Sequence, residues 1–480
     1  MSRSGFGLQG ELAAAVQGPD SSTAFVGRLG DVTTTKLLEA LNHFDAIALL
    51  LLVATLVAFF VPVFILFPPI PVERSDALRQ THSPVGLSSN RSNLRDQLST
   101  GHRPKPGQPA KVQSLYIYPI KSCKGIELAR SRVVSKGLEH DRLFTFAQLR
   151  SPIPAAAPGS GLTDGKPVWE FLTQRQLPLL ANVSVDLWVP DAAKTSRQLG
   201  KVEDTFLVVR FPWMDSGLRG LTQWLAAKIS RGFHATPEKE FMLPVAFPSN
   251  EEIKAQGYTF AHVKIWKDVP YALNMEREVP LELSQYLGVK HRLSLFRIDP
   301  SRQREVLRCA QPKEVLGYQP VVDFHDGYPL HLLSLTSMQD LDTLLLKDEN
   351  IKGLDARRFR ANIIISGSEE YEEETWKVIN FKHPSSKEEC QFDVACRTVR
   401  CKLPNVDPDT GIRHKVEPDR ALRKFRDVDE GAPKSGCLGM QLCPMFPHAA
   451  DSNHNEPISY IEVGMSIDIL KHGSHLYLRQ

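Results

Sequence analysis

Two thiols and a compact acidic turn lie close together in residues 394–411, which read VACRTVRCKLPNVDPDTG. The thiols are Cys396 and Cys401, and three basic side chains lie beside them. A thiol near Arg or Lys is more readily held as the thiolate, the form that acts as nucleophile or metal ligand. We therefore expect Cys401 to bind a metal centre. From this stretch alone, a buried structural cysteine beside a polar turn is the simpler interpretation.

The cysteine pattern and the charge of the whole chain exclude several classes of protein. The seven cysteines are sparse and odd in number, so no secreted disulfide framework is indicated and a reducing compartment fits better. Since none lies in a C-x-x-C pair, a structural zinc site is a weaker alternative. A net charge of +3 over 480 residues, spread along the chain, argues against nucleic-acid binding.

Polar residues at predicted loop tips form a second set of candidates. Lys121 and Ser122 lie on a turn, Arg142 follows an aspartate at the start of a predicted strand, and Arg175 follows another strand-like segment. Arginine offers a planar fork to phosphate oxygens, so these tips could form a phosphate-binding edge. Taken singly, each is more simply explained as an ordinary surface residue.

A basic turn in the second half of the chain leads into the apolar run 363–365. Arg360 and Asn362 alternate with Phe359 and Ala361, so both polar side chains should point to one face at the mouth of a strand. The alternative is that this charge run is solvated, as most are.

Strands are the elements that must position these residues. Alternation in residues 112–147 predicts a meander or small barrel, and a second module begins near residue 321. Residues 217–231 space their apolar side chains at three and four, which predicts an amphipathic helix that packs on the protein. Residues 235–275, rich in proline and charge, predict an insertion or loop.

Residues 46–67 contain no charged side chain. As a helix they would extend about 33 Å, which is enough to cross a hydrocarbon core of about 30 Å. A core helix of this length would carry a polar face, so we predict a transmembrane anchor. Basic residues are more frequent after this span than before it, which places the C-terminal bulk in the cytosol. Residues 69–109, rich in Ser, Pro, Arg and Gln, predict a flexible linker.

Six short motifs occur in one order along the chain. They are YPIKSCKG at 118–125, HDR at 140–142, LTQRQ at 172–176, DGYPL at 326–330, RFRANI at 358–363 and RCKLPNVDPDTG at 400–411. Each is weak alone, but their order is specific. Together they resemble the MOSC proteins, the family related to the C-terminal part of molybdenum cofactor sulfurase, and within it the membrane-anchored amidoxime reductases. The resemblance extends over about residues 110–475.

The resemblance implies an α+β fold that is mostly β. Its expected parts are a tail at 1–45, a transmembrane anchor at 46–68, the linker at 69–109, a MOSC N-terminal β-barrel-like domain at 110–300, and a MOSC β-barrel domain with flanking helices at 301–480. A molybdenum-pterin cofactor would lie between the two domains, with Cys401 as metal ligand and catalytic residue. The residues expected to bind the cofactor are Lys121, Ser122, Arg142, Arg175, Asp326, Arg360, Asn362 and Arg400.

The implied activity is the reduction of N-hydroxylated compounds such as amidoximes. Electrons would come from a b-type cytochrome and its NADH-dependent flavin reductase, which fits the lack of a Rossmann glycine fingerprint in the chain. The expected location is the outer mitochondrial membrane rather than the endoplasmic reticulum. The family also carries an expectation of pyridoxal phosphate binding. The alternative function is a non-redox module that carries sulfur on Cys401 or delivers the cofactor.

Two positions depart from the family pattern. In the animal reductases a second cysteine lies three positions before the metal ligand, whereas Cys396 lies five positions before Cys401 and its role stays open. Gly327 follows Asp326 where the animal enzymes carry hydroxyl residues, so it cannot supply a hydroxyl contact. The 235–275 region could narrow or gate the substrate channel.

Overall fold

The computed structural model describes residues 46–66, 74–150, 167–194, 203–446 and 458–478. The chain divides into two compact units, Met1–Pro71 and Val72–Gln480. In the first unit the described residues form one helix, α2 (Ala46–Leu66). Within the described ranges it is the one helix long and apolar enough to cross a membrane, judged by length and composition. The predicted anchor is thus a continuous apolar helix, and residues 67 and 68 of that prediction lie outside the described residues.

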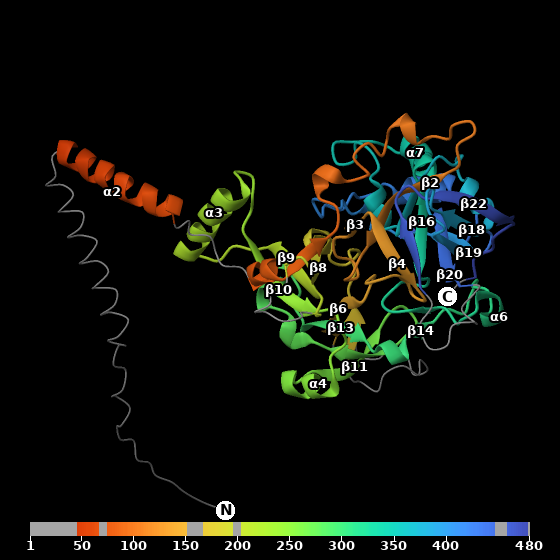
Figure 1. Ribbon diagram of the computed structural model, residues 1–480, viewed down its shortest axis with the longest axis horizontal. Helices are drawn as coiled ribbons and strands as arrows, with labels where there is room; N and C mark the ends of the chain where they lie inside the picture. Colours follow the sequence, from red (N-terminus) through yellow and green to blue (C-terminus); the bar gives the residue numbers. More distant parts are fainter. Residues whose placement is uncertain (1–45, 67–73, 151–166, 195–202, 447–457, 479–480) are drawn as a thin grey trace, which may run out of the picture. The chain divides into compact units, whose positions relative to one another are not determined.

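The second unit is built mainly from strands, as expected from the alternating sequence (Figure 1). Five strands close a first barrel, and all neighbours are antiparallel except β7 and β11. Around this barrel the strands are β11 (Thr259–Lys264), β12 (Tyr271–Asn274), β13 (Leu293–Ile298), β6 (Phe144–Arg150) and β7 (Val168–Phe171). A separate antiparallel sheet contains β1 (His82–Val85), β8 (Ser184–Pro190), β9 (Phe206–Pro212) and β10 (Glu238–Pro244).

A larger sheet forms the second barrel, which is closed by the pairing of β17 with β2. Its order is β17 (Ile363–Ser366), β16 (Leu330–Ser334), β20 (Cys437–Met445), β19 (Glu389–Val399), β18 (Trp376–Lys382), β22 (Ser466–His472), β2 (Lys111–Ile117) and β3 (Ile126–Leu128). Smaller sheets join β21 (Ser459–Glu462) to β4 (Arg130–Val134) and β5 (Gly137–Leu138), and β14 (Arg304–Glu305) to β15 (Val321–Val322).

These pairings cross the boundary predicted between residues 300 and 301. β2 and β3 come from the N-terminal side but belong to the second barrel, and β4, which also pairs with β5, pairs with β21 near the C-terminus. Alternation along the chain indicates a strand and its faces, but it does not indicate the partner strand. The two barrels also share one hydrophobic cluster, which includes Phe146 and Leu295 of the first and Phe381 and Leu442 of the second.

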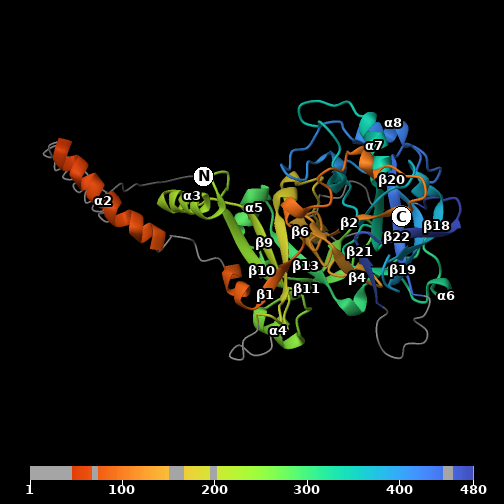
Figure 2. The ribbon, with the colours of Figure 1, turned by 45° about the horizontal axis from the view of Figure 1, so that its top comes forward.

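Helices in the second unit are short and lie around the barrels (Figure 2). The α-helices are α3 (Leu218–Arg231), α4 (Asn250–Gln256), α5 (Leu281–Leu287), α6 (Lys313–Leu316), α7 (Leu335–Thr343) and α8 (Asp419–Phe425). The 3₁₀ turns are η1 (Arg74–Gln80), η2 (Ser89–Arg91), η3 (Thr100–His102), η4 (Pro178–Asn182), η5 (Glu276–Glu278), η6 (Pro300–Arg302), η7 (Ala356–Phe359), η8 (Glu372–Thr375) and η9 (Leu403–Asn405).

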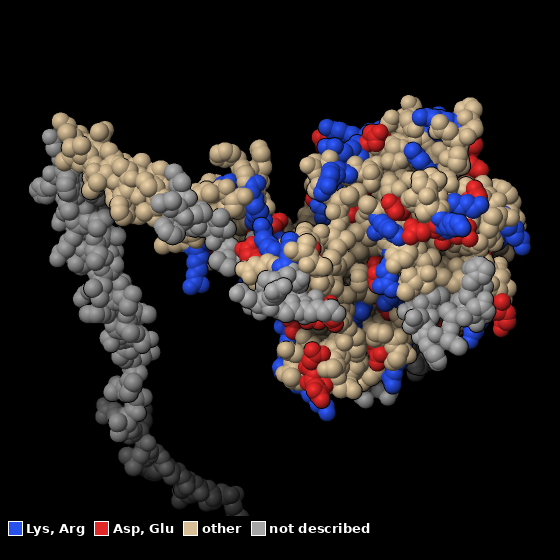
Figure 3. Space-filling model, viewed as in Figure 1, with Lys and Arg blue, Asp and Glu red and all other residues tan. Residues whose placement is uncertain are grey.

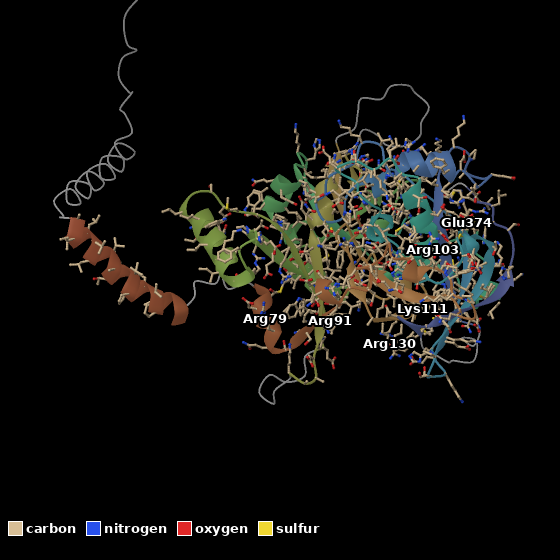
Figure 4. The ribbon with its side chains drawn as sticks, turned by 90° about the horizontal axis from the view of Figure 1, so that it is seen from above. Arg79, Arg91, Arg103, Lys111, Arg130 and Glu374 are labelled. Atoms are coloured by element: carbon tan, nitrogen blue, oxygen red, sulfur yellow. The ribbon has the colours of Figure 1, made fainter. Side chains whose placement is uncertain are left out.

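The prediction of a flexible linker is wrong from residue 74 onward. β1 pairs with β8, and Leu78, Leu94 and His102 are buried. The segment follows one side of the second unit, where Figure 4 labels Arg79, Arg91 and Lys111. The polar composition of this segment was misleading, because a few buried apolar side chains and one strand pairing are enough to give it an ordered structure.

The prediction of a loop at 235–275 is also wrong, because this region contains β10, α4, β11 and β12. Two of its prolines lie at the boundaries of elements. Pro244 is the last residue of β10, and Pro248 precedes the capping box of Ser249 and Glu252 that begins α4.

Residues 218–231 do form the expected helix, but the prediction that its apolar face packs on the protein is wrong. α3 buries Gly220, Ala226 and Ala227 and exposes its larger apolar side chains.

Candidate functional site

A cavity of about 770 Å³ lies among loops from both barrels. This volume falls within the range of roughly 300–1,000 Å³ that is usual for ligand pockets. Its wall contains all nine residues singled out from the sequence, which are Lys121, Ser122, Arg142, Arg175, Asp326, Arg360, Asn362, Arg400 and Cys401. The structure thus brings them together, whereas their individual roles stay predictions.

Cys401 lies just beyond the end of β19, where its thiol is half-buried in the cavity wall. Cys396, five residues earlier, is fully buried in an apolar cluster with Val306, Leu316 and Cys443, and it does not line the cavity. Hydrogen bonding with Cys309 and burial raise the pKa of Cys396 well above its usual value. A buried neutral thiol is chemically inert, so this position does not favour Cys396 as a metal ligand.

The acidic turn that follows Cys401 is tied to the RFRAN segment by ion pairs. Asp407 closes the turn by accepting hydrogen bonds from the backbone N–H groups of Asp409 and Thr410, at 3.1 and 2.9 Å. Arg358 donates to Asp407 at 2.6 Å, and Arg357 donates to both carboxylate oxygens of Asp409, at 2.9 and 2.6 Å. The basic run is therefore not merely solvated, because two of its arginines hold the turn next to Cys401.

The third arginine of that run, Arg360, faces the cavity instead. Its guanidinium stacks 4.1 Å from the ring centre of Tyr118 and donates to the carbonyl oxygen of Cys123 at 2.7 Å. Burial lowers the pKa of Arg360 to about 10, so it stays charged at neutral pH. Arg400 similarly donates to the carbonyl oxygen of Phe359 at 3.0 Å.

Two buried guanidinium nitrogens on this wall, Arg360 Nη2 and Arg400 Nε, have no hydrogen-bond partner among the described residues. A buried donor without a partner costs about 1–3 kcal/mol, so such groups are normally matched by a ligand or water. Guanidinium N–H groups are matched best by phosphate or carboxylate oxygens. Basic lining residues also outnumber acidic ones: Lys121, Arg142, Arg175, Lys267, Arg304, Arg308, Arg360, Arg397 and Arg400 against Asp268, Glu305 and Asp326. The wall is suited to an anionic ligand.

Lys121, Asp326 and Trp266 form a connected chain along another part of the wall. Lys121 Nζ donates to the carbonyl oxygen of Phe324 and to Asp326 Oδ1, both at 2.7 Å. Trp266 Nε1 also donates to Asp326 Oδ1, at 3.0 Å, and Arg175 stacks 4.1 Å from the Trp266 ring centre. Burial lowers the pKa of Lys121 to about 8, despite the neighbouring Asp326. Burial acts to raise the pKa of Asp326, but Lys121 holds it below its usual value.

Asn362 is held entirely within the protein. Its amide oxygen accepts from Arg142 at 3.1 Å and from the N–H of His331 at 3.2 Å. Its amide nitrogen donates to the carbonyl oxygen of Tyr116 at 3.1 Å and to Asp141 at 3.0 Å. With both donors used, Asn362 is placed to orient Arg142 rather than to bind a ligand itself.

Sequence reasoning missed several wall residues, notably Trp266, Arg304 and His331. Arg304 donates to the carbonyl oxygens of Asp323 and His325, at 3.0 and 2.9 Å, and so holds the loop that carries Asp326. His331 lies one residue beyond the DGYPL motif, which was the available signal; burial and Arg400 hold its pKa well below its usual value. Trp266 comes from the region mistaken for a loop, and it lies on the cavity wall. The role of this region in narrowing a substrate channel stays a prediction.

Four wall residues other than glycine adopt left-handed backbone conformations. Their φ angles are 68° for Ser122, 49° for Arg142, 55° for Trp266 and 53° for Arg360. Such conformations cost of order 1 kcal/mol or more each and cluster at ligand sites, where surrounding packing maintains them. Together with the unmatched guanidinium donors, they indicate a wall shaped for a ligand.

Behind the wall, the fully buried carboxylate of Asp141 joins several of these segments. It accepts from the N–H of Tyr118 at 2.7 Å, pairs with Arg142, and lies 3.2 Å from His325 Nε2. Burial would raise the pKa of Asp141, but Arg142 and His325 lower it to about 2. The carboxylate is therefore ionised over the whole physiological range.

Comparison with known proteins places this chain in a family. The MOSC domain model matches residues 319–464, and the MOSC N-terminal beta barrel domain model matches residues 109–225. Together these matches cover more than half of the chain, and the protein belongs to the MOSC family.

Curated relatives carry names that refer to molybdenum and to amidoximes. Mitochondrial amidoxime reducing component 2 of Rattus norvegicus is 26% identical over 327 residues, which is 67% of this chain and 74% of the relative. Mitochondrial amidoxime-reducing component 1 of Homo sapiens is 24% identical over 327 residues, 68% of this chain and 75% of the relative. Molybdenum cofactor sulfurase of Arabidopsis thaliana is 24% identical over 326 residues, 66% of this chain and 31% of the relative.

Replacing Asp141 by Asn should lower stability and alter its dependence on acid. Loss of one partner from a buried ionic cluster costs about 3 kcal/mol or more at neutral pH. Because the folded pKa of Asp141 lies below its unfolded value, this carboxylate stabilises the fold above about pH 4 and loses that effect as the pH falls toward 2. We expect the free energy of unfolding of the wild type to fall about 2 kcal/mol further than that of Asp141→Asn across this interval. Urea denaturation at several pH values measures both quantities. The exposed variant Glu349→Gln is the control, and wild-type stability of Asp141→Asn would contradict the argument.

Replacing Arg360 or Arg400 by Met should weaken anion binding. Each loses charge-assisted hydrogen bonds of about 1.5–3 kcal/mol, so affinity should fall roughly 10- to 100-fold. The measurement is the rise in unfolding temperature with added inorganic phosphate, and Arg91→Met on the exposed surface is the matched control. Equal phosphate protection in all four proteins would show that the cavity is not the anion site.

Proposed function

We propose that the protein is a membrane-anchored molybdenum-cofactor oxidoreductase that reduces N-hydroxylated substrates of the amidoxime type. One observation carries the proposal: a half-buried thiol, Cys401, opens into the same cavity as the unmatched guanidinium donors of Arg360 and Arg400. A molybdenum-pterin group requires a soft ligand for its metal and a binding site for its phosphate. A thiolate is a soft metal ligand, and guanidinium groups bind phosphate. The names of the relatives support the same assignment.

The residues of the cavity fit such a cofactor. Cys401 would be the protein ligand to molybdenum, and Arg142, Arg360 and Arg400 would surround the cofactor's phosphate. Among the described residues, no group of three or more His, Cys, Asp or Glu side chains is placed to hold a metal ion. A metal bound through Cys401 would therefore take its other ligands from the cofactor. When bound, the cofactor supplies the two-electron redox chemistry, while the protein provides binding and orientation.

The remaining wall residues would position the cofactor and supply a proton. Reduction of an N-hydroxyl group consumes two electrons and two protons, breaks the N–O bond and releases one water. Lys121 carries a proton at neutral pH and, with a pKa of about 8, is able to release it. Asp326 keeps the Lys121 ammonium in place, and Trp266 in turn fixes Asp326. Ser122 and Arg175 complete the wall on this side.

In this proposal, electrons come from a b-type cytochrome and its NADH-dependent flavin reductase. α2 anchors the chain in the outer mitochondrial membrane, with the catalytic part in the cytosol. Support comes from the apolar helix and from relatives described as mitochondrial components. Pyridoxal phosphate binding stays a prediction; the cavity lysine Lys121 is ion-paired with Asp326.

A second candidate function is a non-redox module that carries sulfur on Cys401 or delivers the cofactor. It is favoured by the similarity to a molybdenum cofactor sulfurase and by the half-buried position of the thiol.

Metal content and the Cys401→Ser variant test the proposal. The purified full-length wild type should contain molybdenum and pterin in near-equal amounts to protein, and it should reduce benzamidoxime with a chemically reduced viologen dye. Cys401→Ser should lose at least 100-fold in turnover while keeping its fold and most of its pterin, because the phosphate-binding residues are intact. Cys396→Ala, at the buried thiol, is the matched control and should keep near-normal turnover.

Normal turnover by Cys401→Ser would refute the proposed role of this thiol. Wild-type protein without molybdenum but with cyanide-labile sulfur on Cys401 would support the second candidate instead.

A further inference from the structure

α3 presents its apolar face to the outside of the second unit. Leu218, Leu221, Leu225 and Ile229 recur at intervals of three and four residues, so they share one side of the helix, and they are 82%, 61%, 43% and 54% exposed. Trp224 on the same side is 45% exposed. A helix on the surface of a globular protein normally turns such a face inward.

The inward side of α3 is made of small residues, so its direction is set by packing. Gly220 approaches the backbone so closely that a Cβ there would lie 1.9 Å from the carbonyl oxygen of Asp215. Ala226 and Ala227 are each 3% exposed. Gln223, half-buried beside them, donates to Asp215 at 2.9 Å. These contacts prevent α3 from rotating to bury its leucines.

Two further apolar side chains extend the exposed face beyond both ends of the helix. Met214 precedes α3 and is 55% exposed, and Phe233 follows it and is 88% exposed. Figures 1 and 2 show α3 projecting beyond β9 and β10, and Figure 3 shows mainly uncharged atoms there with basic atoms beside them. A contiguous exposed patch of this kind marks an interaction surface.

The exposed face lies close to the point where the chain enters the second unit. Ser75 in η1 donates through its N–H and its hydroxyl to the carboxylate of Glu240, at 2.8 and 2.9 Å. Glu240 lies on β10 two residues from Glu238, which forms an ion pair with Arg231 at the end of α3. A short series of contacts therefore joins η1 to α3 within the second unit.

Chain length limits how far this point can be from a membrane that α2 crosses. α2 ends at Leu66 and η1 begins at Arg74. Eight residue steps cover at most about 28 Å even when fully extended. If α2 spans a bilayer, the start of η1 is thus held within about that distance of its surface, and the contacts through Glu240 and Glu238 keep the end of α3 near η1.

We propose that α3 docks on the surface of the same bilayer, with its leucines, Ile229 and Trp224 in the boundary between headgroups and acyl chains. This inference rests on the membrane anchor included in the proposed function. The composition fits, because α3 has no acidic residue and carries Arg219, Lys228 and Arg231. Tryptophan and leucine on one face with basic residues beside them are typical of helices that lie in the membrane surface. The Lys228 ammonium lies 5.7 Å from the Trp224 ring centre, and its long side chain can reach lipid phosphates.

The test uses the full chain in vesicles of phosphatidylcholine and phosphatidylserine, with a protease site placed within residues 67–73. Co-flotation before cleavage tests the anchor itself. After cleavage, the second unit of the wild type should stay with the vesicles, whereas that of Leu221→Glu/Leu225→Glu should be at least 10-fold more abundant in the soluble fraction. Val315→Glu/Leu346→Glu is the matched control, because both side chains are exposed aliphatic residues at 54% and 63%.

Brominated lipids give a second measurement that does not depend on cleavage. They should quench part of the tryptophan fluorescence of the wild type, and Trp224→Phe should remove that part.

Release of the cleaved wild-type unit, or retention of Leu221→Glu/Leu225→Glu at the wild-type level, would overturn the docking proposal while leaving the anchor intact. A cleaved unit that leaves the vesicles as a dimer, and becomes monomeric in Leu221→Glu/Leu225→Glu, would assign the face to a second copy and would also overturn it. Failure to float before cleavage would refute the anchor, and with it this inference.

Discussion

The carboxylate of Asp141 lies where the two barrels meet, and three segments converge on it. Tyr118, just beyond β2, donates its backbone N–H, and Asn362, just before β17, donates its amide. β2 and β17 are the strands whose pairing closes the second barrel. Arg142, which pairs with Asp141, leads into β6 of the first barrel. One ionised group thus connects the strands that close the second barrel to the start of the first. Two of the residues that contact it, Arg142 and Asn362, also line the cavity.

Two further ion pairs determine which arginine of residues 357–360 reaches the cavity. Arg357 and Arg358 are used by the carboxylates of Asp409 and Asp407, so the acidic turn after Cys401 is fixed against η7. The chain then takes a left-handed conformation at Arg360, which directs that guanidinium to Tyr118 and the cavity. The thiol and the phosphate-binding group therefore come from one clamped assembly, although 41 positions separate them in the sequence.

The prediction from sequence was accurate where local pattern decides structure and wrong where packing decides it. An uncharged run of sufficient length predicted α2, and alternation predicted a mostly β fold. The predicted linker contains β1, because a polar composition does not exclude a strand that pairs with β8. β2 and β3 cross the domain boundary predicted between residues 300 and 301. Strand pairing joins segments that are far apart in the chain, and the sequence of neither strand indicates its partner.

Residue types and local pattern selected Cys401, Arg360 and five further candidates, because thiol and guanidinium chemistry depends on the side chain itself, and the resemblance to the MOSC proteins added Asp326 and Arg400. All nine lie on one cavity wall. The resemblance favoured Cys401 over Cys396, and the tertiary structure shows the physical difference between them: one thiol opens into a cavity and the other is enclosed by apolar side chains. It also assigned Asn362 to holding Arg142, and it placed Trp266 on the wall. The period of α3 was readable from the sequence, but the side it buries was not. Periodicity shows which residues share a face, whereas burial of that face depends on what the rest of the chain packs against it.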